Sequence, residues 1–243
     1  MAEVTIEIVK KLVQESKYLV VFSGSGMQRE CGHSSLRDPS RAYDIEAQYG
    51  YSPEEMFSSA FYNTRIEPFY QFYKKEVLSQ DMEPGAAYEA IAELEKRGIV
   101  KATVTREIYG MCKKAGCQNV LELHGTIEKN HCPHCRKEYP KRYLLDAKKV
   151  PLCEECMVPI RPGIFFYGEM IDNGMMTRVA NEISKADVFL VLGARLDPDF
   201  CDQILSYYNG DKLILLTNRE DYADVNANYM IHGSLNEILT QIL

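Results

Sequence analysis

The chain has 243 residues, of which 46% are hydrophobic, and its formal net charge is −7. This length is enough for one buried α/β core with a small appended module. The negative balance argues against general nucleic-acid binding, because phosphates attract proteins rich in Lys and Arg. We expect neither a membrane span nor a signal peptide, because the sequence has no apolar run of about eighteen residues and no basic-then-apolar start.

Apolar periodicity and turn residues predict alternating helices and strands. Helices are expected over 4–16, 84–97, 172–184 and 199–208, and from a Ser234 cap to the end of the chain; strands are expected over 18–22, 100–104, 120–123, 164–166, 188–192, 213–216 and 229–231. This alternation indicates βαβ units and a mostly parallel, Rossmann-like sheet with helices on both faces.

Two insertions interrupt the alternating pattern. Residues 38–80 are rich in Tyr, Phe and charge at helical spacing, and we interpret their aromatics as a local core. Residues 126–161 contain paired cysteines. We therefore predict one domain built from 1–37, 81–125 and 162–243, and a small domain formed by the helical and the cysteine-rich insertions.

The cysteine-rich insertion carries two CxxC pairs, Cys132 with Cys135 and Cys153 with Cys156, separated by seventeen residues. Two thiolate pairs at this spacing are typical of one tetrahedral Zn²⁺. Four sulfurs leave no open position, so the metal is expected to be structural. Two disulfides or four core thiols are the alternative, which the polar, Lys-rich flanks disfavour.

Cysteine usage also bears on the compartment. A zinc pattern in a chain with eight cysteines suggests a reducing cytoplasm. The other four cysteines are expected to be ordinary buried thiols, and they are Cys31, Cys112, Cys117 and Cys201.

A glycine-rich turn follows the first predicted strand, with Gly24, Ser25 and Gly26 in sequence. Such a turn lets backbone N–H groups approach a phosphate closely. The full GxGxxG spacing is absent, because Arg29 stands where the third glycine would be. The turn alone is therefore weak evidence for nucleotide binding.

Polar and small residues also follow the other predicted strands. Ligands of parallel sheets bind at the carboxyl ends of strands. The residues expected to meet there are Arg106, Glu107, His124, Gly193, Ala194, Arg195 and Asn218. A histidine at a strand end is structural in most proteins, but His124 directly precedes the zinc module and lies among the other strand ends, which favours a functional role.

The ordered set of motifs resembles the sirtuin (Sir2) family over nearly the whole chain. The matching stretches are GSG at 24–26 with Leu36 and Arg37, TREIY at 105–109, ELHG at 122–125, the two CxxC pairs, 160–169, GARL at 193–196, Asn218 and HG at 232–233. The resemblance implies a protein-lysine deacylase that consumes NAD, releases nicotinamide and transfers the acyl group to ADP-ribose. It also implies that His124 is the general base on a ribose hydroxyl.

The resemblance further assigns the binding residues. NAD or ADP-ribose and an acylated-lysine peptide are the expected partners, with no nucleic acid and no membrane. The residues expected to bind the nucleotide are Gly24, Ser25, Gly26, Leu36, Arg37, Arg106, Glu107, Gly193, Ala194, Arg195, Asn218 and Ser234.

The sequence departs from the family pattern at positions that take part in the family's reaction and in peptide binding. The family's Asn and Asp become Glu107 and Tyr109, its shielding Phe becomes Leu36, and a Ser becomes Gln28. An ionised Glu107 only accepts hydrogen bonds, and Tyr109 offers no carboxylate. On the peptide side, Pro198 removes one backbone donor from the edge that pairs with substrate.

Three functions therefore remain open from the sequence. The first is an NAD-dependent deacylase with weakened activity. The second is an NAD-cleaving or ADP-ribosyl-transferring enzyme, in which Glu107 stabilises positive charge at the anomeric carbon beside His124. The third is a non-catalytic module that binds a nucleotide or an acyl-peptide.

Overall fold

The computed structural model describes residues 5–33, 35–36 and 38–243. Its main element is a six-stranded parallel sheet in the order β3-β2-β1-β6-β7-β8. The strands are β1 (Leu19–Ser23), β2 (Val100–Thr105), β3 (Val120–Glu122), β6 (Val188–Leu192), β7 (Leu213–Thr217) and β8 (Tyr229–His232). The strand order reverses between β1 and β6, as in doubly wound nucleotide-binding folds, which confirms the predicted fold class.

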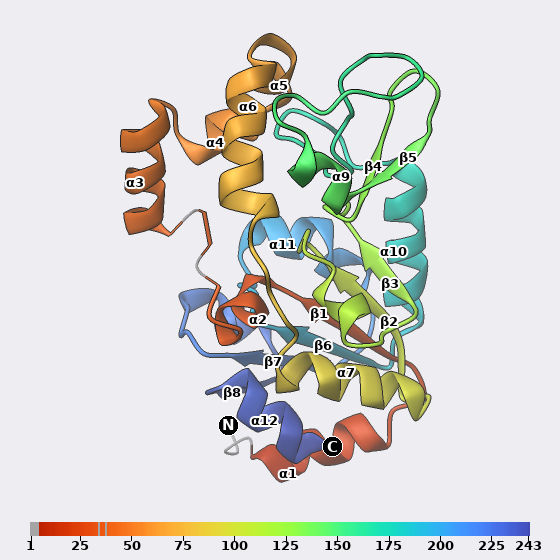
Figure 1. The fold of residues 1–243 in the computed structure, drawn as a ribbon. Coiled ribbons are helices and arrows are strands. Elements are labelled where there is room, and N and C mark those ends of the chain that lie inside the picture. The colour runs from red at the N-terminus through yellow and green to blue at the C-terminus, as the bar shows by residue number, and fades with distance from the viewer. Residues whose placement is uncertain (1–4, 34, 37) are drawn as a thin grey trace.

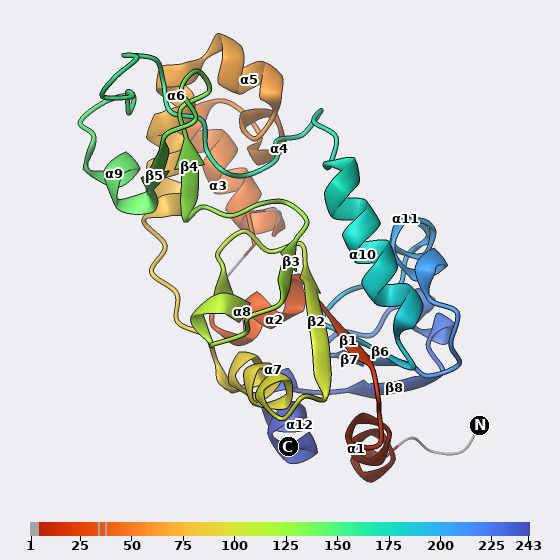
Figure 2. The same cartoon turned by 90° about the vertical axis from the view of Figure 1, so that its right-hand side faces the viewer.

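Helices cover both faces of this sheet, as Figures 1 and 2 show. One face packs against α1 (Ile6–Gln14), α7 (Ala86–Lys96) and α12 (Leu235–Ile242), and the other against α10 (Asn173–Lys185) and α11 (Pro198–Gln203). The central strand shows why both faces need a cover. Leu19 and Val21 belong to one core cluster, whereas Val20 and Phe22 belong to the other. Such a continuous apolar run fits a strand buried on both sides.

Shorter helical elements lie in the connections between the strands of the main sheet. They are α2 (Ser25–Glu30), α8 (Met111–Lys114), and the 3₁₀ segments η2 (Leu205–Tyr207) and η3 (Tyr222–Asn226). The sequence pattern did not predict α2, α8 or η3. The predicted helix 199–208 is in fact α11 followed by η2, with a break at Ile204, whose φ of −121° is not helical.

The helical insertion contains α3 (Pro39–Tyr49), α4 (Pro53–Met56), α5 (Ser59–Thr64), α6 (Ile66–Phe72) and a π-helical turn, η1 (Tyr73–Leu78). Its aromatic residues form a local core, as predicted. Phe69 and Tyr73 stack at 5.2 Å between ring centroids, and both are fully buried. The cysteine-rich insertion contributes the hairpin of β4 (Lys129–His131) and β5 (Glu138–Pro140), followed by α9 (Lys141–Asp146).

The two insertions contact each other directly at the top of Figure 1. The Tyr62 and Tyr70 hydroxyls both donate to the Ile160 carbonyl, and Lys74 Nζ lies 2.5 Å from the carbonyls of Ala147 and Lys149. The division of the chain into the two predicted domains stays a prediction.

The prediction of a strand at 164–166 is wrong. This segment joins no strand of the main sheet and makes only an isolated bridge between Ile164 and Gly125. Its backbone is paired elsewhere, because Phe165 N–H donates to the His124 carbonyl and Tyr167 N–H to the Phe57 carbonyl. The apolar run therefore links the end of β3 to the helical insertion. Every other predicted strand has a counterpart with ends within one residue.

Candidate active site

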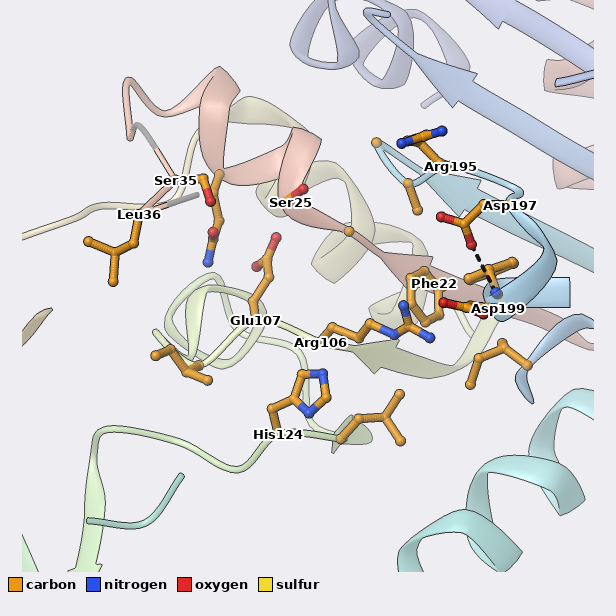
Figure 3. Close-up of a pocket in the computed structure, with 18 of the residues that line it drawn as sticks. Phe22, Ser25, Ser35, Leu36, Arg106, Glu107, His124, Arg195, Asp197 and Asp199 are labelled. Atoms are coloured by element: carbon orange, nitrogen blue, oxygen red, sulfur yellow. Dashed lines mark hydrogen bonds between the residues drawn. The ribbon is translucent and has the colours of Figure 1, made fainter. Parts of the chain in front are cut away.

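A cleft of about 1030 Å³ lies at the carboxyl ends of the strands, between the sheet, the helical insertion and the segment 164–169. Residues that follow four of the strands line this cleft. Gly24 follows β1, Arg106 and Glu107 follow β2, His124 follows β3 and Gly193 follows β6. The helical insertion closes the opposite side with Phe57. Figure 3 shows Glu107, Arg106 and His124 in this one space although they come from two different connections of the sheet.

The glycine turn is built by close packing of two strand ends. Gly24 N–H donates to the Leu192 carbonyl and Gly26 N–H to the Gly193 carbonyl, both at 2.8 Å. A Cβ on Gly26 would lie 2.5 Å from Gly193 Cα, so a side chain at either position would separate the turns. The short contact fixes the β1–α2 turn against the β6 end and leaves Ser25 at the cleft wall.

His124 is held by its own backbone and by the glycine after it. The His124 carbonyl accepts a hydrogen bond from Phe165 at 3.0 Å. Gly125 has a φ of +72°, and a Cβ there would lie 2.1 Å from the Gly163 carbonyl oxygen. Only glycine fits this crossing of two chain segments, which explains the His-Gly pair and directs the histidine into the cleft (Figure 3).

The predicted nucleotide-binding residues separate into four groups. Those that line the cleft are Gly24, Ser25, Leu36, Arg106, Glu107, Gly193, Ala194 and Arg195. Gly26 is buried behind the lining. Asn218 and Ser234 lie outside the lining, and Arg37 lies outside the described residues.

Glu30 explains where Asn218 and Ser234 lie. Its carboxylate accepts from Asn218 Nδ2 through one oxygen and from Ser234 Oγ through the other, each at 2.9 Å. We call this arrangement the Glu30 clamp. It ties the end of α2 to the end of β7 and to the start of α12, where Ser234 also caps the helix by accepting from Glu237 N–H. A contact of Asn218 or Ser234 with a nucleotide stays a prediction.

Arg106 and Arg195, both expected to bind the nucleotide, are placed differently. The Arg106 guanidinium lies 5.8 Å from the ring centroids of both Phe22 and Phe200. Arg195 is more exposed, and its Nε lies 2.7 Å from Asp221 Oδ2. Figure 3 shows them on different sides of the cleft.

The four cysteines of the CxxC pairs come together in the small module. Their Sγ atoms all lie within 4.8 Å of one another, and those of Cys135 and Cys153 are 3.6 Å apart. Two sulfurs bound to one tetrahedral Zn²⁺ at about 2.3 Å would lie about 3.8 Å apart. The cluster therefore fits one zinc ion, as predicted.

Two matching turns create this cluster. In each, a backbone N–H donates to the first sulfur at 3.4 Å, from Cys135 to Cys132 and from Cys156 to Cys153. Each turn ends in a left-handed residue, Arg136 at φ +65° or Met157 at φ +55°. Hydrogen bonds to the sulfurs stabilise the thiolate form that binds metal. Tyr139 adds another, at 3.2 Å to Cys153.

The remaining cysteines are free thiols. Cys112 and Cys117 are buried, as expected, whereas Cys31 and Cys201 are only partly buried.

Comparison with known proteins decides the family. The Sir2 family model matches residues 24–197, which is more than half of the chain. The chain belongs to the Sir2 family. It is 31% identical over 239 residues to an NAD-dependent protein deacetylase of Clostridium acetobutylicum and 30% identical over 238 residues to one of Staphylococcus aureus, with 98% of both chains covered in each case.

Solved Sir2 structures share the fold. A Sir2 homologue in complex with NAD has a TM-score of 0.83 at 26% identity, covering 97% of this chain and 91% of that one. A complex of Sir2 with a p53 peptide and NAD+ has a TM-score of 0.80 at 27% identity, covering 98% and 97%. No helix in the described part of the chain is long and apolar enough to cross a membrane.

Within this Sir2-family cleft, Glu107 differs from what the sequence suggested. The side chain is 5% exposed, and its oxygens accept from Tyr88 Oη at 2.7 Å and from Ser23 Oγ at 3.4 Å. Burial raises the pKa of Glu107 to about 8, against the lowering effect of these two hydroxyls. The carboxyl group is therefore mostly neutral at pH 7, and a neutral carboxyl group can donate as well as accept.

Tyr109 and His33 close the cleft beside Glu107. Their rings meet edge to face at 4.9 Å, and both side chains are buried. Burial raises the pKa of Tyr109 to about 12 and lowers the pKa of His33. Both groups are therefore neutral at pH 7, and the Arg41 charge nearby acts on both of them.

Sequence reasoning missed several charged residues of the cleft, among them Arg29, Arg219 and Asp224. Arg29 was noted only as a departure from a glycine motif. Arg219 follows Asn218 at the end of β7, and this position was the available signal. Asp224 belongs to η3, which was not predicted. It is 4% exposed and contacts His232 Nε2 at 2.8 Å.

Proposed function

We propose that the chain is an NAD-dependent protein-lysine deacylase that releases nicotinamide. The observation that carries the proposal is that His124, the glycine turn and the β6 end line one cleft, in a chain that aligns along its whole length with NAD-dependent protein deacetylases. A cleft of about 1030 Å³ is also large enough for a dinucleotide.

Three parts of the cleft would have separate roles in nucleotide binding and catalysis. In the glycine turn, the Gly24 N–H is held by the Leu192 carbonyl, so the backbone N–H of Ser25 would be the group that approaches the diphosphate of NAD. His124 would accept the proton of a ribose hydroxyl, which would make that oxygen a nucleophile. A neutral Glu107 would offer a ribose hydroxyl both a donor and an acceptor, which replaces part of what the family's asparagine provides.

An acylated-lysine peptide would enter between the two parts of the molecule. Residues 166–169 and 193–195 both line the cleft. Pro198 occupies the first turn of α11, where a helix leaves its N–H groups unbonded. Because proline has no N–H, this position offers the peptide backbone no donor. We therefore expect the peptide backbone to be bound more weakly here.

The four-sulfur site would hold one structural Zn²⁺, and no chemical step would involve it, because four thiolates complete the coordination. We also propose a cytoplasmic location, since a reducing compartment keeps these thiolates available to the metal.

Nicotinamide release from NAD, measured with and without an acetyl-lysine peptide, tests the function. Peptide-dependent release supports the deacylase. Release without peptide would support an NAD-cleaving or ADP-ribosyl-transferring enzyme, and no release would support a binding module. The second function needs an ionised Glu107, and the burial of its carboxyl group works against that, since burial outweighs the opposing effect of the Tyr88 and Ser23 hydroxyls.

Binding provides a second test, at the nicotinamide end. Tyr109 lacks the carboxylate that the family pattern places there, and a lost buried hydrogen bond costs about 1–3 kcal/mol. ADP-ribose has no nicotinamide and avoids this loss. We expect calorimetry to show ADP-ribose binding at least as tightly as NAD; about tenfold tighter NAD binding would contradict this.

A further inference from the structure

Two arginines lie together on one side of the cleft, at the carboxyl end of β7. Arg29 is in the last turn of α2, and Arg219 follows β7; both line the cleft. The Arg29 Nε atom is buried and has no hydrogen-bond partner among the described residues. Burial and the neighbouring Arg219 charge lower the pKa of Arg29, whereas Asp38 raises it. The two positive charges are therefore close enough to repel each other.

The Glu30 clamp fixes this arrangement. Glu30 follows Arg29 in the chain, and Asn218 precedes Arg219, so the hydrogen bond between Glu30 and Asn218 joins the residues next to the two arginines. The hydrogen bond from Ser234 holds the same carboxylate from α12. The end of α2, the end of β7 and the start of α12 thus hold Arg29 and Arg219 close together, although their positive charges repel each other.

Two acidic side chains that follow β7 in the chain and line the cleft, Asp221 and Asp224, are already engaged. Asp221 contacts Arg195 Nε at 2.7 Å, and Asp224 contacts His232 Nε2 at 2.8 Å. These contacts reduce what either carboxylate offers to Arg29 and Arg219. A buried guanidinium nitrogen without a partner is costly, and an anion that accepts from both side chains would satisfy it.

The fold indicates which anion suits the place. The unit β6, α11 and β7 repeats the strand–glycine turn–helix–strand plan of a mononucleotide-binding half, with Gly193 in the turn. In such halves the second strand ends near a ribose, where an arginine accommodates a phosphate. The guanidinium fork also matches phosphate oxygens in pairs.

We propose that Arg29 and Arg219 form a two-arginine subsite that binds a phosphate group of the nucleotide; this inference rests on the proposed function. The phosphate could come from the diphosphate bridge that all ADP-ribosyl nucleotides share, or from an extra phosphate on the adenosine ribose. Both sources present phosphate oxygens to the two guanidinium groups, with one negative charge on each phosphate of the diphosphate bridge and up to two on a ribose monophosphate. The test below separates them.

Calorimetry with ADP-ribose and with 2′-phospho-ADP-ribose tests the subsite in the full-length, zinc-loaded protein. We compare native protein with Arg29→Gln, Arg219→Gln and the double variant. Arg178→Gln, an exposed arginine of α10 outside the cleft, is the matched control. The double variant is expected to lose about tenfold or more in affinity, the usual scale for charge-assisted hydrogen bonds to phosphate, and the control is expected to change less than about twofold.

The pattern across the two ligands identifies the source. An equal loss for both ligands assigns the subsite to the diphosphate, and a loss seen mainly with 2′-phospho-ADP-ribose assigns it to the extra phosphate. Either result supports the subsite. Affinities of the double variant that match those of the control for both ligands would overturn it.

Two controls keep the outcomes distinct. If native protein binds neither ligand, the nucleotide site of the proposed function fails, and the subsite falls with it. If native protein binds and the variants bind equally well, only the subsite fails. Because Arg219 is exposed, Arg219→Gln is expected to fold even if a change at the partly buried Arg29 is not tolerated. In that case the affinity of Arg219→Gln for the two ligands is the test of the subsite.

Discussion

The zinc cluster and the nucleotide cleft are built in opposite ways. Each half of the zinc cluster is a short local turn, in which a CxxC pair, its N–H to sulfur bond and a left-handed residue follow one another in the chain. The cleft is assembled from the ends of several strands and from an insertion far away in sequence. A site of local turns can be recognised from spacing alone, whereas a site of strand ends depends on how the sheet is ordered.

The largest effect is expected at the zinc cluster. Cys153→Ala leaves three sulfurs, and structural zinc supplies roughly 10–16 kcal/mol of apparent binding energy in small zinc modules. We expect the variant to lose zinc and the module to unfold, while the Rossmann-like unit keeps its secondary structure. Metal analysis and circular dichroism measure both effects. Cys201→Ala, outside the cluster, is the control; a variant that retains one zinc per chain would contradict the assignment.

The next effect concerns Glu107 and pH. A buried carboxyl group with its pKa raised to about 8 keeps its proton in the folded state, whereas the unfolded chain releases it near pH 4.5. Its contribution to stability is therefore complete below the unfolded pKa and is lost as pH rises to about 8. Glu107→Gln removes this loss, which amounts to about 5 kcal/mol at most.

The measurement is the free energy of unfolding between pH 5 and 8.5, from denaturant titrations. We expect the Glu107→Gln variant to gain stability relative to the native protein as pH rises. Glu89→Gln, on the exposed face of the neighbouring helix α7, is expected to show no such trend. A stability difference that does not change with pH would mean that Glu107 is ionised in the folded protein.

His124→Ala tests the chemistry of the cleft. A general base contributes about 10²–10⁴-fold to rate, or about 3–5 kcal/mol. Peptide-dependent nicotinamide release is expected to fall by this factor, while the affinity for ADP-ribose changes little. If release and affinity fall together, His124 acts in binding and not as a base.

The smallest effect is expected at the Glu30 clamp. Glu30→Gln keeps the shape of the side chain but removes its charge and makes one of the two accepting oxygens a donor group, which costs about 1 kcal/mol of stability for a partly exposed hydrogen bond. The melting temperature should fall by a few degrees for a domain of this size. Glu237→Gln on the exposed surface of α12 is a suitable comparison, and an unchanged melting temperature for Glu30→Gln would show that the clamp is not needed to hold α2.

Local pattern was enough for much of the molecule. The parallel sheet, the zinc ligands and the position of His124 at a strand end were predictable because each depends on residues close together in sequence: an apolar run, a CxxC spacing, a polar residue after a strand. The segment 164–166 has the same apolar composition as a strand, but its backbone partners are His124 and the helical insertion, and no local pattern identifies them.

Tertiary structure decided the electrostatics of the cleft. The sequence alone presents Glu107 as a carboxylate, but packing against Tyr88 and Ser23, which come from other elements, makes it a mostly neutral acid. It also brings Arg29 and Arg219 together from positions 190 residues apart, and draws Asn218 to Glu30. Sequence fixes which groups can be charged, whereas burial and neighbours set the free energy of each charge, and these exist only once the chain has folded.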